Sequence, residues 1–186
     1  ARAHGDSEGT KIGMGWPERF DVIEWVKLII SWDSNAQIIL HGVSMGAATV
    51  LMASGEELPE NVKAIIADCG YTSEWDEFKC EANALHIPWF PVLNAASVMS
   101  RLRDGYDFKQ ASALEKVKQS RIPTLFIHGS DDELVPYSML DKLYSAAACE
   151  KECLTVNGAG HALSSSVEPE LYWNTVESFI DKYLGK

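Results

Sequence analysis

Apolar residues along the chain recur in two alternating patterns, one typical of buried strands and one typical of helices. Short apolar runs occur at residues 37–43, 62–69, 124–129 and 151–156. Runs of this length with several β-branched residues are typical of strands that are buried on both faces of a sheet. The sequence therefore predicts four strands in these ranges.

Between these runs, apolar residues recur at steps of three and four, which indicates helices. The pattern predicts helices around residues 22–30, at 45–54, around 140–147 and, with Pro169 in the first turn, near the end of the chain. The apolar stripe of that last helix consists of Tyr172, Trp173, Val176, Phe179, Ile180 and Tyr183. Strands that alternate with helices predict an α/β fold, with a mostly parallel sheet covered by helices on both faces.

Residues 70–123 interrupt this alternation, because the segment is too long for a simple crossover between two strands. We expect a helical cap there, inserted into a core made of residues 1–69 and 124–186. The aromatic residues of the cap would either contact an apolar substrate group or fill the cap's own small core. The candidates for substrate contact are Trp75, Trp89 and Phe90.

Composition narrows the classes of partner. The chain has 186 residues, 46% of them hydrophobic, which suits one globular domain with a real core. Its formal net charge of −11 repels nucleic-acid phosphates and anionic lipid headgroups. We therefore expect no nucleic-acid partner.

The cysteines follow no pattern of a metal or redox motif. None of Cys69, Cys80, Cys149 and Cys153 forms a C-x-x-C pair, and no Cys/His cluster has zinc spacing. We expect free thiols and no bound metal. No apolar run approaches the ~20 residues that span a bilayer, and no signal peptide is visible. These features favour a cytoplasmic location.

The stretch Gly42-Val43-Ser44-Met45-Gly46 lies where a strand is predicted to end and a helix to begin. It matches G-x-S-x-G, a sharp strand-to-helix turn that exposes a serine hydroxyl. Glycines are expected on both sides, because side chains there would collide with the crossing strand and helix. Ser44 is the candidate nucleophile, and the Met45 N–H at the helix start is a candidate oxyanion donor. The alternative is an ordinary glycine-rich turn.

A serine nucleophile needs a base and a group that orients the base. In the chain order serine, acid, histidine, carboxylates follow the third predicted strand in "HGSDDELVP", and His161 follows the fourth in "GAGHAL". Parallel strands place such loops at one edge of the sheet. The sequence therefore predicts that Ser44, an aspartate at 131 or 132, and His161 meet there.

These motifs together resemble the α/β-hydrolase superfamily of serine hydrolases. The pattern H-G-x-x-D-x-x-V-P corresponds to His128, Gly129, Asp132, Val135 and Pro136, and it favours Asp132 over Asp131 as the acid. "GAGH" fits the family's G-x-G-H. "ARAHGDSEG" is similar to its D-x-R-G-x-G-x-S loop, with Ala3 where glycine is usual. The resemblance implies catalysis without a cofactor.

"DCGYTSEWDEF" and "LRDGYDFKQASAL" resemble a bacterial subgroup of such hydrolases that is often described as cell-surface or membrane-anchored. The location is then cytoplasmic, or membrane-anchored if a further N-terminal segment carries an anchor. Other polar residues near the predicted edge are expected to be structural. These are Asp68 (an alternative acid), Cys69, His41, His128, His86, and His4 beside Arg2.

The resemblance also implies that the chain holds the last four of the family's eight strands. Residues 37–40 would then be an apolar edge that lacks its neighbouring strand, and one oxyanion donor would be missing. We expect an N-terminal segment of the same polypeptide, or another chain, to complete the sheet. The alternative is a trimmed hydrolase with a rebuilt edge.

The sequence thus predicts a serine hydrolase that cleaves a small-molecule carboxylic ester through Ser44, Asp132 and His161. A peptidase of the prolyl-oligopeptidase type and a non-catalytic binding module that keeps the fold stay open as alternatives. The oligomeric state stays open as well.

Overall fold

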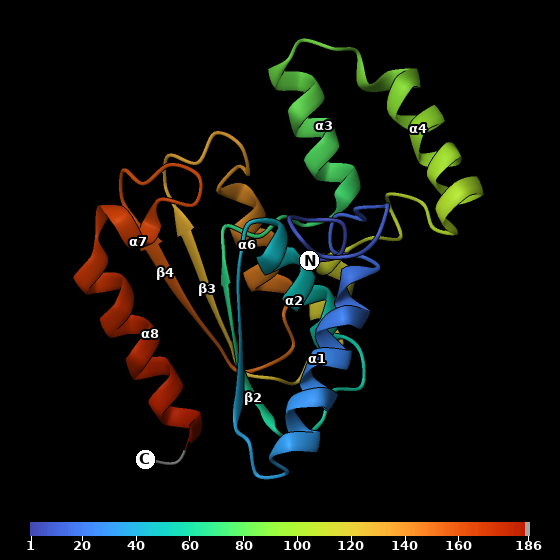
Figure 1. Cartoon of the computed structure of the whole chain (residues 1–186). Coiled ribbons are helices and arrows are strands. Elements are labelled where there is room, and N and C mark those ends of the chain that lie inside the picture. Colours follow the sequence, from blue (N-terminus) through green and yellow to red (C-terminus); the bar gives the residue numbers. More distant parts are fainter. Residues whose placement is uncertain (185–186) are drawn as a thin grey trace.

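Four strands form one parallel sheet in the order β1-β2-β3-β4 (Figure 1). The computed structural model describes residues 1–184. The strands are β1 Ile38–Val43, β2 Val62–Asp68, β3 Thr124–Gly129 and β4 Lys151–Val156. All four predicted strands are confirmed, and their ends differ from the prediction by a single residue at two places.

Helices precede β1, occupy each connection between strands and follow β4. They are α1 Glu18–Trp32, α2 Met45–Ser54, α3 Glu74–Ala84, α4 Trp89–Asp104, α5 Ala113–Val117, α6 Ser138–Ala146, α7 Ser164–Val167 and α8 Pro169–Leu184. The helices predicted from the apolar periodicity are confirmed. Ala147, which was expected on the apolar face of α6, lies just after that helix as its C-cap.

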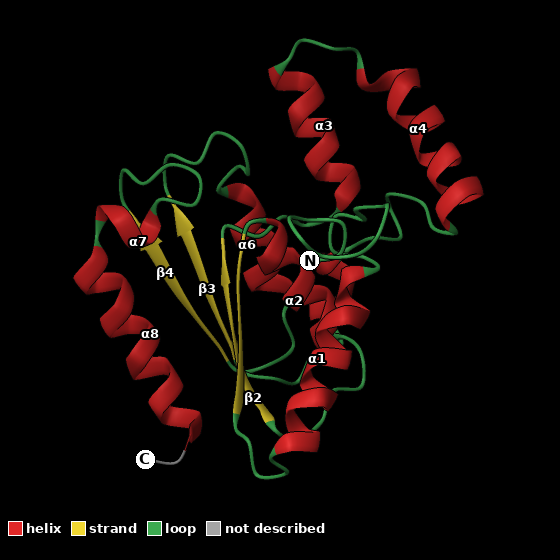
Figure 2. Ribbon diagram, in the orientation of Figure 1, coloured by secondary structure: helices red, strands yellow, loops and turns green. Residues whose placement is uncertain are grey.

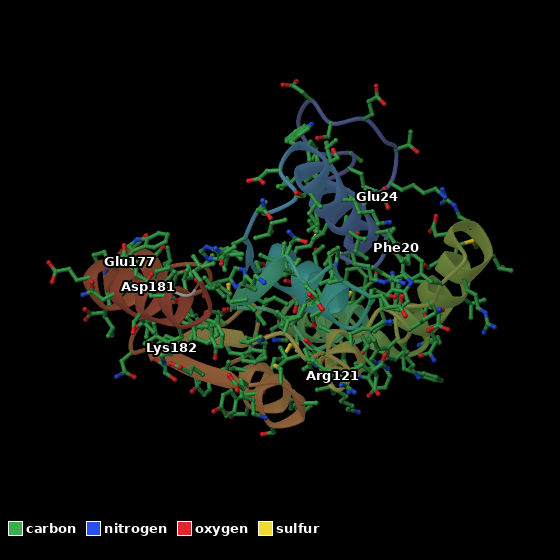
Figure 3. The ribbon with its side chains drawn as sticks, turned by 90° about the horizontal axis from the view of Figure 1, so that it is seen from below. Phe20, Glu24, Arg121, Glu177, Asp181 and Lys182 are labelled. Atoms are coloured by element: carbon green, nitrogen blue, oxygen red, sulfur yellow. The ribbon has the colours of Figure 1, made fainter. Side chains whose placement is uncertain are left out.

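The sheet is covered on both faces, as the continuous apolar runs of its strands require (Figure 2). On β2, Ile65 and Ala67 point into the core that α1, α2, α5 and α6 cover, whereas Ala64 and Ile66 point into the core under α8. Figure 3, seen from below, shows the two layers apart, with Glu24 on α1 and Glu177 on α8.

The chain between β2 and β3 forms α3, α4 and α5. α5 returns to the body of the molecule, since Ala113 and Val117 belong to the main core. By contrast, α3 and α4 form a pair that extends from the side of the sheet at which the strands end (Figure 1). Whether this pair acts as a cap over a substrate stays a prediction.

In the sheet that residues 1–184 form, β1 and β4 are the outer strands. On β1, Ile38 and Leu40 are buried against the helices, whereas Val43 is 41% exposed. The predicted apolar edge is thus an outer strand, and its completion by another segment remains an expectation. None of the helices in the described part of the chain is both long and apolar enough to cross a membrane.

Candidate active site

The turn between β1 and α2 is sharp and strained. Ser44 has φ 55° and ψ −119°, a conformation that residues with a side chain rarely adopt. A Cβ on Gly42 would lie 2.2 Å from the carbonyl oxygen of Gly46, so only glycine fits there. A Cβ on Gly46 would meet no atom of residues 1–184 within 4 Å. Among these residues, the expectation that both glycines prevent a collision is therefore correct for Gly42 and wrong for Gly46.

Backbone hydrogen bonds between neighbouring strand ends hold this turn. The Ser44 N–H donates to the carbonyl of Asp68 over 2.8 Å, and the Cys69 N–H donates to the carbonyl of Ile127 over 2.9 Å. Cys69 also has positive φ, 47°. Three consecutive strands of the sheet are thus tied together at their carboxyl ends, where the serine lies.

The side chains of Ser44, His161 and Asp132 form one hydrogen-bonded chain. Nε2 of His161 lies 2.8 Å from Oγ of Ser44, and Nδ1 of His161 lies 2.9 Å from Oδ2 of Asp132. The Asp132 carboxylate can only accept, so Nδ1 carries the ring proton and Nε2 accepts the serine hydroxyl proton. This geometry allows the ring to act as a general base toward Ser44.

The Asp132 side chain is fully buried, and all of its described partners donate to it. Oδ1 accepts the backbone N–H groups of Leu134 and Val135 over 3.0 and 2.9 Å. Oδ2 lies 3.3 Å from Nε2 of the buried His128. Burial alone would raise the pKa of Asp132, but the hydrogen bonds from His128, His161 and Val135 outweigh it and hold the pKa below its ordinary value. The carboxylate is therefore ionised at neutral pH.

The two rival acids lie elsewhere. Asp131 is exposed, and its carboxylate accepts the Ser130 hydroxyl over 2.6 Å. Asp68 is buried and accepts the Ser164 hydroxyl over 3.3 Å. Burial, the largest influence, raises the pKa of Asp68, and hydrogen bonds from Tyr172 and Ser164 offset part of that rise. Of the three carboxylates at positions 68, 131 and 132, only that of Asp132 is hydrogen-bonded to His161 among the described residues.

Three of the four remaining histidines have partners outside the Ser44–His161–Asp132 chain, and the fourth is exposed. His41 contacts the hydroxyl of Tyr172 over 3.0 Å, and Nε2 of His128 donates to the Val135 carbonyl over 2.9 Å. Nδ1 of His4 lies 2.9 Å from the Arg2 carbonyl, and His86 lies exposed in the α3–α4 turn. Of these four, only His128 contacts the acid, so it holds Asp132 in place.

The N-terminal loop is anchored to α1. Ala3 has φ 58°, in the region that favours glycine, which explains why the similar loops carry glycine there. Nε of Arg2 donates to Asp21 on α1 over 2.6 Å and so anchors the loop.

Cys69 lies beside the hydrogen-bonded chain, as its place at the end of β2 suggested. Its Sγ, a carboxylate oxygen of Asp132 and a ring nitrogen of His161 lie within 4.8 Å of one another. Burial and the nearby Asp68 raise the pKa of the Cys69 thiol to about 12. The thiol is therefore protonated and a weak nucleophile, and it lacks the turn that exposes Ser44.

A cleft of about 620 Å³ opens beside the Ser44 turn, between α1 and α2. Met45, Gly46 and His41 line it together with Trp25, whose side chain is 61% exposed. Met45 is the first residue of α2, so its N–H has no acceptor within the helix and is free to bind an oxyanion. The apolar pattern of residues 22–30 predicted a helix but did not indicate a role for Trp25, because the cleft depends on how α1 lies beside α2.

The three predicted substrate contacts lie in the α3–α4 pair. The rings of Trp75 and Trp89 are 6.5 Å apart, and those of Trp89 and Phe90 are 6.2 Å apart. Lys109 and Lys79 lie over the rings of Trp75 and Trp89. This cluster does not line the cleft beside Ser44. A role in substrate binding therefore stays a prediction.

Comparison with known protein families identifies the family of the chain. Residues 15–186 match the prolyl oligopeptidase family. The chain belongs to that family. As a prolyl oligopeptidase family member it has part of the α/β-hydrolase fold, and the resemblance to the α/β-hydrolase superfamily is confirmed.

Sequence relatives are longer than this chain. It is 30% identical over 182 residues to the uncharacterised protein YqkD of Bacillus subtilis, and the aligned region covers 97% of this chain and 60% of YqkD. It is 30% identical over 148 residues to the lysophosphatidylserine lipase ABHD12 of Macaca fascicularis, and that aligned region covers 79% of this chain and 36% of the lipase. The chain thus spans about 60% or less of these relatives.

Among solved structures, the chain is similar to the esterase Pf2001 of Pyrococcus furiosus. The TM-score is 0.77 at 22% identity, and the match covers 98% of this chain and 68% of the esterase. At this identity the likeness supports the fold, and the superfamily to which the chain belongs is one of hydrolases.

Proposed function

We propose that the chain carries the catalytic site of a serine hydrolase that cleaves carboxylic esters through an acyl-enzyme. The observation that supports this proposal most strongly is the hydrogen-bonded chain from Ser44 through His161 to the buried Asp132. A serine hydroxyl is a weak nucleophile unless a base accepts its proton and a third group orients that base. The three residues supply these three roles.

In the acylation step, Nε2 of His161 takes the Ser44 proton while Oγ attacks the ester carbonyl carbon. Asp132 keeps the ring proton on Nδ1 and stabilises the imidazolium that forms. The Met45 N–H at the start of α2 donates to the developing oxyanion, aided by the positive end of the helix dipole. His161 then gives its proton to the alkoxide as the alcohol leaves.

In the deacylation step, water takes the place of the alcohol. His161 accepts a proton from that water, the hydroxide attacks the acyl carbon, and the proton returns to Ser44 as the acid leaves. The protein supplies every proton transfer, so the mechanism requires no cofactor.

A second oxyanion donor would come from outside the 184 described residues. In this fold it belongs to the loop after the strand beside the nucleophile strand, and β1 has a free edge in the sheet described here. We infer that another segment of the same polypeptide pairs with β1 and supplies this donor. One missing donor typically lowers kcat by about 10²–10³-fold.

Peptide hydrolysis is the second candidate, because the matching family is the prolyl oligopeptidase family. We favour esters as the substrate class of this chain, because ABHD12, a relative at 30% identity, is a lipase. Side-by-side assays of p-nitrophenyl esters of graded chain length and of short prolyl peptide anilides, on the full-length polypeptide, separate the two.

The proposal predicts ester hydrolysis that Ser44→Ala lowers by at least about 10³-fold. Faster turnover of the prolyl anilides would favour the peptidase. If no activated ester or anilide is cleaved, the fold serves as a binding module instead.

A further inference from the structure

The exposed side of α4 is more apolar than its buried side. The buried residues are Leu93, Ser97 and Ser100. On the opposite side, at helical spacing, lie Val92, Val98, Met99 and Leu102, which are 53–77% exposed. A helix on the surface of a soluble protein has the reverse polarity. This inversion indicates that the outer side of α4 meets an apolar environment.

The turn between α3 and α4 and the start of α4 also expose apolar side chains. Leu85 and Ile87 in the turn are 66% and 47% exposed, and Phe90 in the first turn of α4 is 65% exposed. Figure 1 shows that this turn is the part of the α3–α4 pair that lies farthest from the sheet, and Figure 3 shows α4 standing clear of the body. We call the seven residues the cap patch: Leu85, Ile87, Phe90, Val92, Val98, Met99 and Leu102.

The charges around the cap patch differ from those of the rest of the chain. Residues 82–103 contain no Asp or Glu, although the whole chain has a net charge of −11. The segment carries Arg101 and Arg103, both exposed. Asp104, which follows it, is paired with Lys11. The segment that carries these exposed apolar residues therefore adds two cationic side chains and no carboxylate.

We propose that the cap patch binds the surface of a phospholipid bilayer, with a preference for anionic lipids. Exposed Phe and Leu side chains next to Arg are typical of segments that lie in the membrane interface. α4 has 16 residues and one polar side, so it would lie along the surface rather than span it. This inference goes beyond the proposed hydrolysis and does not depend on it, because bilayer binding needs no catalysis.

The net negative charge of the chain opposes approach to an anionic surface. Screening limits this repulsion to about 8–10 Å at ordinary ionic strength. The segment that would enter the interface bears no acidic group, and each Arg near an anionic surface strengthens binding about fivefold. Local charge and apolar area therefore decide the binding of the patch.

Co-sedimentation of the full-length polypeptide with vesicles tests the proposal. One set of vesicles is pure phosphatidylcholine, and in the other about one third of the lipid is phosphatidylglycerol. We expect binding to both, stronger to the anionic set. Leu102→Glu should weaken it at least about tenfold, and Arg101→Gln/Arg103→Gln should weaken only the anionic preference. Leu102 is 77% exposed, so an unchanged melting temperature should accompany the loss.

Two further variants make the test specific. Leu171→Glu, the same change at a 46% exposed site on α8, should leave vesicle binding unchanged. Ser44→Ala should also bind vesicles as the parent does, which separates this inference from the proposed hydrolysis. Absence of vesicle binding, or equal binding by the parent and Leu102→Glu, would overturn the proposal. So would a dimer that Leu102→Glu dissociates without any vesicle binding, because the patch would then join two copies.

Discussion

Asp132 and His128 form a second contact behind the one that Asp132 makes with His161. Oδ2 of Asp132 lies 2.9 Å from Nδ1 of His161 and 3.3 Å from Nε2 of His128. One buried oxygen thus joins the proposed base to a ring that is fixed by the Val135 carbonyl. The acid is held from behind, which fixes the orientation of the His161 ring in front of Ser44.

Replacement of this acid should remove most of the activity while the protein stays folded. In Asp132→Asn the amide can donate to Nδ1, which favours the wrong tautomer of His161, so kcat should fall on the order of 10⁴-fold. The measurement is kcat for a short p-nitrophenyl ester, with circular dichroism as the check on folding. Asp131→Asn is the matched control at an exposed neighbour and should keep nearly full activity. Equal losses in both variants would contradict the assignment of the acid.

Gly42 and Gly46, the two glycines of the turn at Ser44, should respond differently to the same added methyl group. In Gly42→Ala the new Cβ would lie 2.2 Å from the Gly46 carbonyl oxygen, so the turn must shift. We expect a clear loss of thermal stability and at least about a 10²-fold loss of ester hydrolysis, because a small displacement of a nucleophile has such effects. In Gly46→Ala no atom of residues 1–184 lies within 4 Å of the new atom, so the melting temperature should stay the same. A stable, active Gly42→Ala protein would show that the described turn is wrong.

Two buried glutamates at the base of the cap should make stability depend on pH. Oε2 of Glu74 and of Glu77 has no hydrogen-bond partner among residues 1–184. Burial is the main cause that raises the pKa of Glu74 from 4.5 to about 8 and that of Glu77 to about 7. The folded state therefore holds protons that the unfolded chain releases. As far as these two groups are concerned, the free energy of unfolding is highest below pH 4.5. It falls as the pH rises above that value, until the pH has passed the folded pKa values of about 7 and 8.

Glu74→Gln removes one of these titrations. The variant should unfold at a higher temperature than the parent at pH 9, by roughly 2–4 °C for each kcal/mol recovered, and should differ little from it at pH 5. Glu60→Gln, at an exposed site, is the control and should not change the pH profile. If the melting temperatures of the parent and of Glu74→Gln changed with pH in the same way across this range, the result would contradict the buried, unpaired state of Glu74.

Local patterns predicted the sheet and the three residues that meet at its edge. Buried parallel strands are continuous apolar runs, and the turn at Ser44 needs glycine at 42 for a local steric reason. Chain order then placed an aspartate at 131 or 132 and His161 at adjacent strand ends, and the resemblance to the α/β-hydrolase superfamily favoured Asp132. Apart from that choice, each of these inferences needs only neighbours along the chain and the geometry of a parallel sheet.

Other features depend on distant contacts and were not predicted. Glu74 reads as a first-turn acid of an exposed helix, yet it is 3% exposed, and part of the rise in its pKa comes from Glu18, far away in the sequence. The space beside Gly46 depends on what packs against α2. The inverted polarity of α4 depends on how that helix is oriented. A local pattern contains none of this information.

Covalent labelling of the nucleophile tests the central claim most directly. A fluorophosphonate probe reacts with a serine only when a base activates it, so the probe should label the full-length polypeptide once. Peptide mapping should place the label on Ser44. Ser44→Ala should not be labelled, whereas Ser166→Ala, at an exposed serine, should be labelled like the parent. A label on any other residue, or equal labelling of Ser44→Ala, would contradict the account.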